Sequence, residues 1–245
     1  MIDLIKMWTK PKMLAYTLVT MVLYPLLIYP FQNFTIFAGH ADYLRVGIGI
    51  PVAFSFLFGP AAAWGTAFGN LIYDVSTDGL RWISLFGFLG NFLVAYIPYK
   101  LWSAVTSEKP DLRSIKKAAL FVVVTLFACS LCGLIIGWGL LYLYSAPFTM
   151  TVFTITMTDA LWGIILGAVL LAASYAFFSR RKLLYSDILA LMPKPAWSKT
   201  RSLAIAAYAF GLVACLAVAE VDGISPYMLA PFVIVSFAGA VAACK

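Results

Sequence analysis

The stretch LFGPAAAWGTAFGNLIYD, residues 57–74, interrupts an otherwise apolar chain. Gly59 admits a sharp bend and Pro60 removes a backbone hydrogen-bond donor, so a helix that arrives there has to end. Small residues follow at four-residue spacing from Ala61 to Gly69, which is a pattern that lets a second helix approach closely. We therefore expect the chain to reverse its direction at Gly59–Pro60.

The composition predicts a membrane protein. Hydrophobic residues make up 63% of the chain and charged residues only 11%, and the mean hydropathy is +0.96. Soluble proteins do not reach these values, and the long apolar runs differ from the short alternating strands of a membrane barrel. The expected fold class is an all-α polytopic membrane protein in a lipid bilayer. The net charge of +7 follows from basic residues near helix ends, so no nucleic-acid partner is expected.

The apolar runs predict about eight transmembrane segments. They lie near residues 13–31, 46–58, 60–73, 82–99, 118–142, 149–179, 203–219 and 226–243. At a rise of about 1.5 Å per residue, the second and third segments each cover roughly 20 Å of a hydrocarbon layer about 30 Å thick. Residues 46–73 are therefore either two short spans or a re-entrant hairpin buried by its neighbours.

The distribution of positive charge supports the reversal. With a turn at Gly59–Pro60, all lysines and arginines except Arg45 and Arg81 lie on one side, which the positive-inside rule makes cytoplasmic. A single bent span over residues 46–73 would instead place the basic residues of 100–117 and 180–201 outside. Both termini are therefore expected in the cytoplasm.

Three polar residues are predicted at membrane depth. Asp159 lies near the middle of its segment, where an aspartate costs about 2.5–3.5 kcal/mol on insertion scales. Asn70 and Asn91 are amides in neighbouring segments. Two interpretations stay open. The three side chains lock helices together by hydrogen bonds, or they face a solvent-filled cavity.

A second group of polar and aromatic residues is expected at the outer surface, where a small solute arrives. The group consists of His40, Asp42, Arg45, Asp74, Asp78, Arg81, Trp82, Trp138, Tyr142, Tyr144, Phe148, Glu220 and Asp222. Asp74 and Asp78 are one helical turn apart beside Arg81, so they would present a polar rim to a ligand. His40 is the sole histidine. It is either a solvated loop residue or a ligand contact. No catalytic or metal-ligating residue is expected.

The sequence LRVGIGIPVAFSFLFGPAAAWGTAFGNLIYD, followed by GFLGNFLVAYIPYKLW, resembles the S component of energy-coupling factor (ECF) vitamin transporters. The resemblance covers roughly residues 10–180 and rests on Gly59, Pro60, Gly69, Asn70, Asp74, Asn91, Pro98 and Lys100. It implies a six-helix protein of a prokaryotic cell membrane that captures a vitamin or related micronutrient from outside. It also implies that the ligand is held near His40, Asp78, Trp82, Asn91, Trp138 and Asp159.

The resemblance further implies a membrane coupling subunit and paired cytoplasmic ATPases. The chain contains no G-x-x-x-x-G-K-[S/T] phosphate loop, so another polypeptide would have to hydrolyse ATP. Three regions are expected: an S-component-like domain over residues 1–180, a basic cytoplasmic linker over 181–202, and an extra helix pair over 203–245. The aromatic outer segments suit a planar ring, and His40 leaves room for a tetrapyrrole such as cobalamin or haem.

Two other functions remain as alternatives. Asn70, Asp74 and Asp78 form the pattern N-x-x-x-D-x-x-x-D, whose acids would hold Mg²⁺ against a diphosphate in a prenyltransferase-like enzyme. Against this interpretation, no second helix carries paired aspartates, and the predicted location is outside the cell. A scaffold subunit of a larger complex without transport activity would explain the glycine stripes and the extra helices without any ligand.

Overall fold

The computed structural model describes residues 2–34, 44–191, 198–221 and 225–244, which form helices and no strand within these ranges. The elements are α1 (Ile2–Lys6), η1 (Met7–Thr9), α2 (Pro11–Ile28), η2 (Tyr29–Phe31), η3 (Val46–Ile48), α3 (Gly49–Phe58), α4 (Pro60–Thr77), α5 (Ile83–Val105), α6 (Ile115–Tyr144), α7 (Phe148–Arg180), α8 (Tyr185–Ile188), α9 (Lys199–Ala219) and α10 (Pro226–Ala243). Six of the described helices are long and apolar enough to cross a membrane, and the stretch Val46–Phe58 is a shorter apolar helix. The prediction of an all-α polytopic membrane protein is confirmed.

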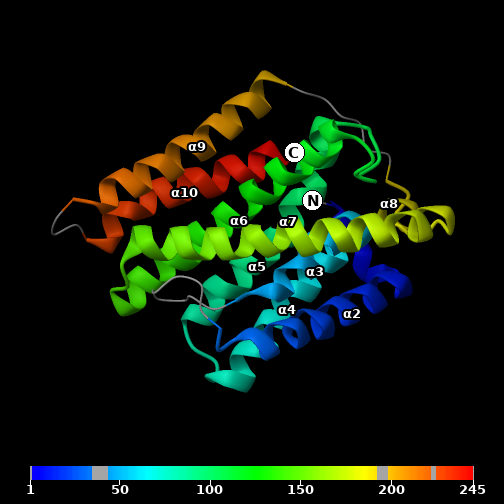
Figure 1. Cartoon of the computed structure of the whole chain (residues 1–245). Coiled ribbons are helices and arrows are strands. Elements are labelled where there is room, and N and C mark those ends of the chain that lie inside the picture. Colours follow the sequence, from blue (N-terminus) through cyan, green and yellow to red (C-terminus); the bar gives the residue numbers. More distant parts are fainter. Residues whose placement is uncertain (1, 35–43, 192–197, 222–224, 245) are drawn as a thin grey trace.

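The chain reverses at Gly59, as the sequence predicts. Gly59 has φ 53° and ψ −118°, and α4 begins at the next residue, Pro60. A side chain at Gly59 would be strained at this φ, and its Cβ would lie 2.6 Å from the ring of Tyr185. The two short helices then separate, because α3 packs mainly on α7 whereas α4 packs on α2 and α5 (Figure 1).

The small residues of α4 serve close helix packing. A Cβ at Gly65 would lie 2.6 Å from the backbone oxygen of Thr17, and one at Gly69 would lie 2.9 Å from that of Met21. Both atoms belong to α2, so a larger residue would push the two helices apart. The stripe from Ala61 to Gly69 is therefore a helix-packing surface.

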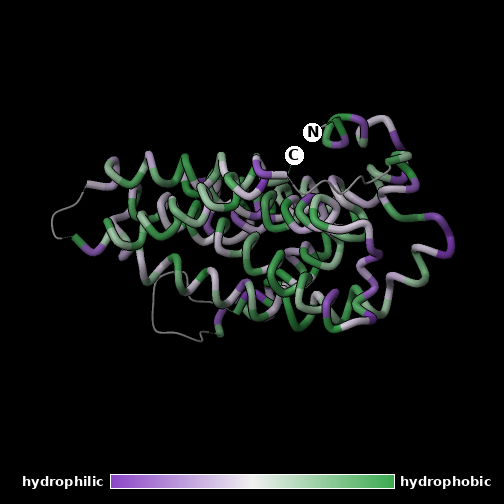
Figure 2. The backbone as a smooth tube through the Cα atoms, turned by 90° about the horizontal axis from the view of Figure 1, so that it is seen from above, coloured by the Kyte–Doolittle hydropathy of each residue, from purple (hydrophilic) through white to green (hydrophobic). Residues whose placement is uncertain are grey.

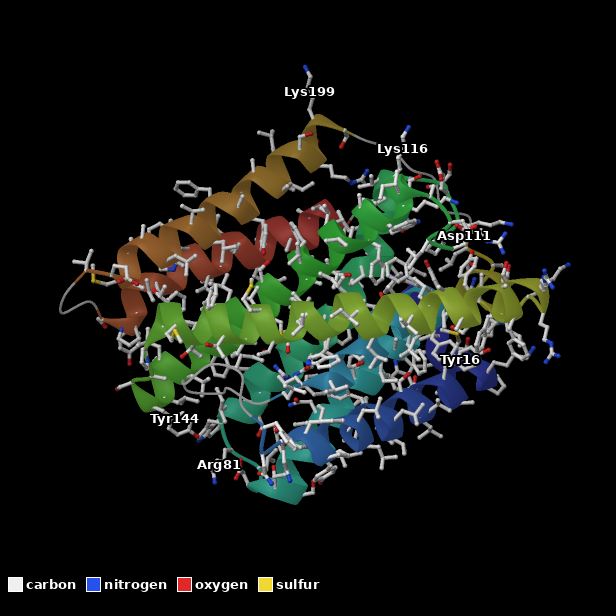
Figure 3. The ribbon with its side chains drawn as sticks, viewed as in Figure 1. Tyr16, Arg81, Asp111, Lys116, Tyr144 and Lys199 are labelled. Carbon is white, nitrogen blue, oxygen red and sulfur yellow. The ribbon has the colours of Figure 1, made fainter. Side chains whose placement is uncertain are left out.

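The connections between the helices gather at two ends of the bundle. One end holds α1, α8 and the α5–α6 connection, and we name it the α8 end (Figure 1). Asp111 and Lys116 lie there, whereas Arg81 and Tyr144 lie at the opposite end, which we name the Arg81 end (Figure 3). Strongly hydrophilic segments mark the turns of the α8 end, and the helices between the ends are largely hydrophobic (Figure 2). The charge distribution predicts that the α8 end is cytoplasmic.

The last two helices pack on α5 and α6. The ring of Tyr208 in α9 packs against that of Phe127 in α6 with 4.0 Å between centroids, and its hydroxyl forms a hydrogen bond with Ser130. Arg201 is buried and donates to the backbone oxygens of Ala104 and Ala243, each at 3.0 Å. These contacts tie α9 and α10 to the helices that precede the linker.

Candidate functional site

A buried ion pair connects the start of η3 to the middle of α7. Nη1 of Arg45 lies 3.3 Å from both carboxylate oxygens of Asp159, and the two side chains are 4% and 0% exposed. The expectation that Arg45 lies at the outer surface is therefore wrong. A carboxylate at this depth needs an opposite charge beside it, and Arg45 reaches inward to supply that charge.

Amide and hydroxyl groups extend this pair across the bundle. Tyr24 donates its hydroxyl to Oδ1 of Asn91 at 2.6 Å, and Nη2 of Arg45 donates to the same oxygen at 3.2 Å. Nδ2 of Asn91 donates to Oδ1 of Asn70 at 2.9 Å, and Asn70 donates to Asp74 at 3.1 Å. We call the whole set the polar network, and its members are Tyr24, Arg45, Asn70, Asp74, Asn91 and Asp159.

The polar network joins four helices in the half of the bundle nearer the Arg81 end. Tyr24 and Asn70 lie in the second halves of α2 and α4, whereas Asn91 and Asp159 lie in the first halves of α5 and α7. Tyr24 is fully buried, and it is not among the site residues expected from the sequence. The available signal was a hydroxyl in the apolar run before Pro25, but a tyrosine in a membrane helix is usually an interfacial anchor.

Several buried polar atoms around Asp159 have no hydrogen-bond partner among the described residues. Oδ1 of Asp159 is one of them, although Arg45 neutralises the carboxylate. Thr156 lies one turn before Asp159 on α7, and its hydroxyl lacks a partner too. Thr125 of α6, which packs against Gly163 one turn after Asp159, is in the same situation. Buried polar groups are normally satisfied, so these atoms leave hydrogen-bonding capacity unused among the described residues.

The other predicted contacts lie outside the polar network. Asp78 and Arg81 form an exposed pair 3.8 Å apart, and the side chain of Trp82 is 75% exposed. Trp138 donates its indole N–H to the backbone oxygen of Pro226 at 3.1 Å, and Tyr142 packs edge-on against Tyr227. Both of these aromatics therefore contact the beginning of α10. His40, Asp42 and Asp222 lie outside the described residues.

The acids of the N-x-x-x-D-x-x-x-D pattern do not share a site. Asp74 accepts a hydrogen bond from Asn70, whereas Asp78 lies on the exposed side of the next turn beside Arg81. The part of the chain that the structure describes contains no group of three or more histidine, cysteine or acidic residues that would hold a metal ion. The four cysteines are buried free thiols.

Comparison with known proteins assigns the chain to a family. The model of the family described as QueT transporter matches residues 13–176. Neither the curated proteins nor the solved structures contain a match. The matched range includes every member of the polar network, and a transporter family argues against the enzyme and scaffold alternatives. This multi-pass membrane protein therefore belongs to the QueT transporter family, whose members are S components of ECF-type transporters.

Proposed function

We propose that this chain is the substrate-binding subunit of an ECF-type importer that captures a precursor of queuosine from outside the cell. The family supports the class of ligand, because it is associated with uptake of queuosine precursors. The observation that carries the binding site is the buried Arg45–Asp159 pair, one of whose carboxylate oxygens accepts no hydrogen bond from the described residues.

The chemistry of the polar network suits a small polar heterocycle. Queuosine is a 7-deazaguanine nucleoside, and such a ring has N–H donors on one edge and a carbonyl acceptor beside them. Asp159 would accept from those donors, and the amides of Asn70 and Asn91 would meet the remaining polar groups. This donor and acceptor set matches a deazaguanine better than the large apolar perimeter of cobalamin or haem, for which the aromatic outer segments and His40 were the sequence features.

Binding would exchange internal hydrogen bonds for bonds to the ligand. The guanidinium of Arg45 contacts Asp159, Asn91 and Tyr24, so it keeps the network paired when no ligand is bound. An incoming ring would replace some of these hydrogen bonds with its own. No buried charge would then be left without a partner, so the free-energy cost of breaking the internal bonds would be low. We propose His40, Asp42, Asp78, Arg81 and Trp82 as the outer rim of this site.

Transport would require other polypeptides. We propose a membrane coupling subunit and paired ATPases as partners, with residues 1–180 as the capture unit, 181–202 as a basic linker and 203–245 as an added helix pair. The family match ends at residue 176, close to the first of these boundaries. The absence of a phosphate loop in the sequence supports separate ATPases.

A binding measurement on the purified protein tests the proposal. Titration calorimetry with 7-deazaguanine bases is expected to give saturable binding, and haem and cobalamin are expected to give none. Asp159→Asn should weaken binding by about 10- to 100-fold, because it removes a charged acceptor. Asp187→Asn, a matched change on an exposed carboxylate in α8 and outside the proposed site, should leave the affinity within about threefold. Failure of every deazaguanine to bind, or equal loss in both variants, would overturn the proposal.

A further inference from the structure

Two adjoining cavities lie at the α8 end, away from the polar network. The larger has a volume of about 370 Å³ and lies between the end of α5, the α5–α6 connection, the end of α7 and α8. The smaller has a volume of about 200 Å³ and lies between the same connection and α7. Both are lined by Lys109, Tyr175 and Ser179, so they form one continuous recess.

Positive charge predominates in this recess. Lys109 and Lys182 line the larger cavity, and Arg113 and Arg180 join Lys109 around the smaller one. None of these side chains forms an ion pair with a carboxylate in the described part of the chain.

The acids nearby, Glu108 at the larger cavity and Asp111 at the smaller one, offset these cations only in part. Glu108 and Asp111 both bind Lys117, at 3.5 and 2.9 Å. Lys117 holds the pKa of Asp111 below its usual value through a hydrogen bond and its charge, so this carboxylate stays ionised and paired. Asp187 adds one carboxylate at the larger cavity, which leaves a surplus of cations.

The walls of the recess add donors of the kind that bind phosphate oxygens. Ser103, Thr106, Ser107, Ser179 and Ser186 line the larger cavity with hydroxyl groups. Guanidinium, ammonium and hydroxyl groups together form the usual donor set for a phosphate, and Arg113 and Arg180 can each bind two of its oxygens. The chemistry of the recess therefore points to a phosphate-bearing ligand.

The recess continues onto the apolar surface of the bundle. The smaller cavity is lined by Ala172 and Ala176, which are one turn apart on α7 below Arg180. Ile165 and Val169 precede them on the same face of the helix and are 52% and 61% exposed. Small residues beside the cations and larger apolar residues beyond them provide a path for a hydrocarbon chain. A free phosphate ion would use only the cationic part.

We propose that this recess binds an anionic phospholipid, with its phosphate at Lys109, Arg113 and Arg180 and an acyl chain along Ala172 and Ala176. Such a lipid would hold the α8 end against a negatively charged leaflet, where each basic residue near the surface contributes to attraction. The site is separate from the ligand site proposed above and does not depend on it.

Native mass spectrometry of the full chain, released from nanodiscs of equal parts phosphatidylglycerol and phosphatidylcholine, tests the proposal. The wild type is expected to retain phosphatidylglycerol preferentially. The triple variant Lys109→Ala, Arg113→Ala, Arg180→Ala should reduce that retention by roughly 100-fold. A control variant of equal charge, Lys10→Ala, Lys12→Ala, Lys199→Ala, removes cations outside the recess and should retain the lipid. Equal retention of both lipids by the wild type, or equal loss in both variants, would overturn the proposal.

A second variant separates a lipid from a free anion and does not depend on the stability of the triple variant. Ala172→Trp with Ala176→Trp fills the apolar part of the recess and leaves every cation in place. It should abolish retention of phosphatidylglycerol. Inorganic phosphate would contact only the cations, so any rise in melting temperature that it produces should be the same in this variant as in the wild type. If phosphate stabilises the protein and the tryptophan variant still retains the lipid, the recess is a free-anion site and the proposal is wrong.

Discussion

Arg45 and Asp159 belong to distant parts of the chain, yet Nη1 of Arg45 lies 3.3 Å from both oxygens of the Asp159 carboxylate. The pair fixes the segment that leads into η3 against α7, and through Asn91 it extends to α4 and α5. A single contact thus connects the packing of the bundle to the charge of the candidate binding site.

Removing one charge of this pair should destabilise the protein more than removing both. Arg45→Met or Asp159→Leu alone leaves an uncompensated buried charge, at a cost of about 3–5 kcal/mol. The double variant is expected to recover most of that loss and to bind no deazaguanine. Thermal unfolding in detergent, measured for the complete double-mutant cycle, checks this. A double variant that is no more stable than the singles would show that the charges do not compensate each other.

The hydroxyl of Tyr24 should contribute to stability although it lies in an apolar helix. The Tyr24 hydroxyl donates to Asn91 and accepts from Arg45, and Tyr24→Phe removes both buried hydrogen bonds. The free energy of unfolding should therefore fall by about 1–3 kcal/mol. Tyr144→Phe is the matched control, because Tyr144 is 52% exposed. Equal melting temperatures for the two variants would contradict the role assigned to Tyr24.

The sequence predicts the reversal at Gly59 and the depth of Asn70, Asn91 and Asp159 for local reasons. Glycine followed by proline favours a helix end through the two residues alone, and a polar residue in an apolar run is conspicuous by itself. The burial of Arg45 is different, because it depends on where the preceding segment leaves the chain relative to α7. No local pattern contains that information.

The same limit applies to the aromatic residues near the Arg81 end. Trp138 is suitable for a binding-site rim, but its indole bonds to Pro226 at the start of α10. Its environment is set by the packing of the last two helices on α6, and a helix that is apolar around most of its circumference does not reveal which face it packs. Tyr24 was missed for a related reason, since its partners come from other helices.

The tip of the α3–α4 hairpin should tolerate no side chain. Gly59→Ala introduces strain at φ 53° and a Cβ that would lie 2.6 Å from the Tyr185 ring. Gly79→Ala is a matched control, because Gly79 has φ 76° and a Cβ added there would meet nothing within 4 Å. The control should lower the free energy of unfolding by about 1–2 kcal/mol through backbone strain alone. Gly59→Ala should lower it by about 1–3 kcal/mol more, because the added Cβ overpacks against Tyr185. Chemical unfolding of both variants in detergent measures the difference, and equal losses would rule out the Tyr185 contact as its cause.

Asp3 should make the free energy of unfolding depend on pH in the acidic range. It is buried in α1, where Lys100 lies 2.9 Å from its carboxylate and Tyr99 donates a hydrogen bond at 2.8 Å. Burial by itself would raise the pKa of Asp3, but Lys100 and Tyr99 outweigh it and lower the pKa below the ordinary 3.8. Because the pKa of Asp3 is lower in the folded state than in the unfolded state, its stabilisation is complete at a pH above the unfolded-state pKa. The stabilisation is lost as the pH falls through the folded-state pKa.

Melting curves of the wild type and Asp3→Asn between pH 3 and 7 check this prediction. The wild type should be the more stable at neutral pH, and the difference should shrink as the pH falls below about 4. In a Lys100→Met background the advantage of Asp3 over Asn at neutral pH should disappear, because burial then opposes ionisation without the ammonium that offset it. A difference that stays constant over the whole range would show that the ionised form of Asp3 is not stabilised.

The Arg81 end should face the outside of the cell, because the basic residues of the α5–α6 connection and of the end of α7 lie at the α8 end, as Lys116 does in Figure 3. In a variant whose native cysteines are replaced by alanine, Asp78→Cys should react with a membrane-impermeant maleimide in intact cells. Ser107→Cys, exposed on the α5–α6 connection, should react only after the membrane is opened. The opposite pattern would place the polar network near the cytoplasm. Capture of a nutrient from outside would then be impossible by the route proposed here.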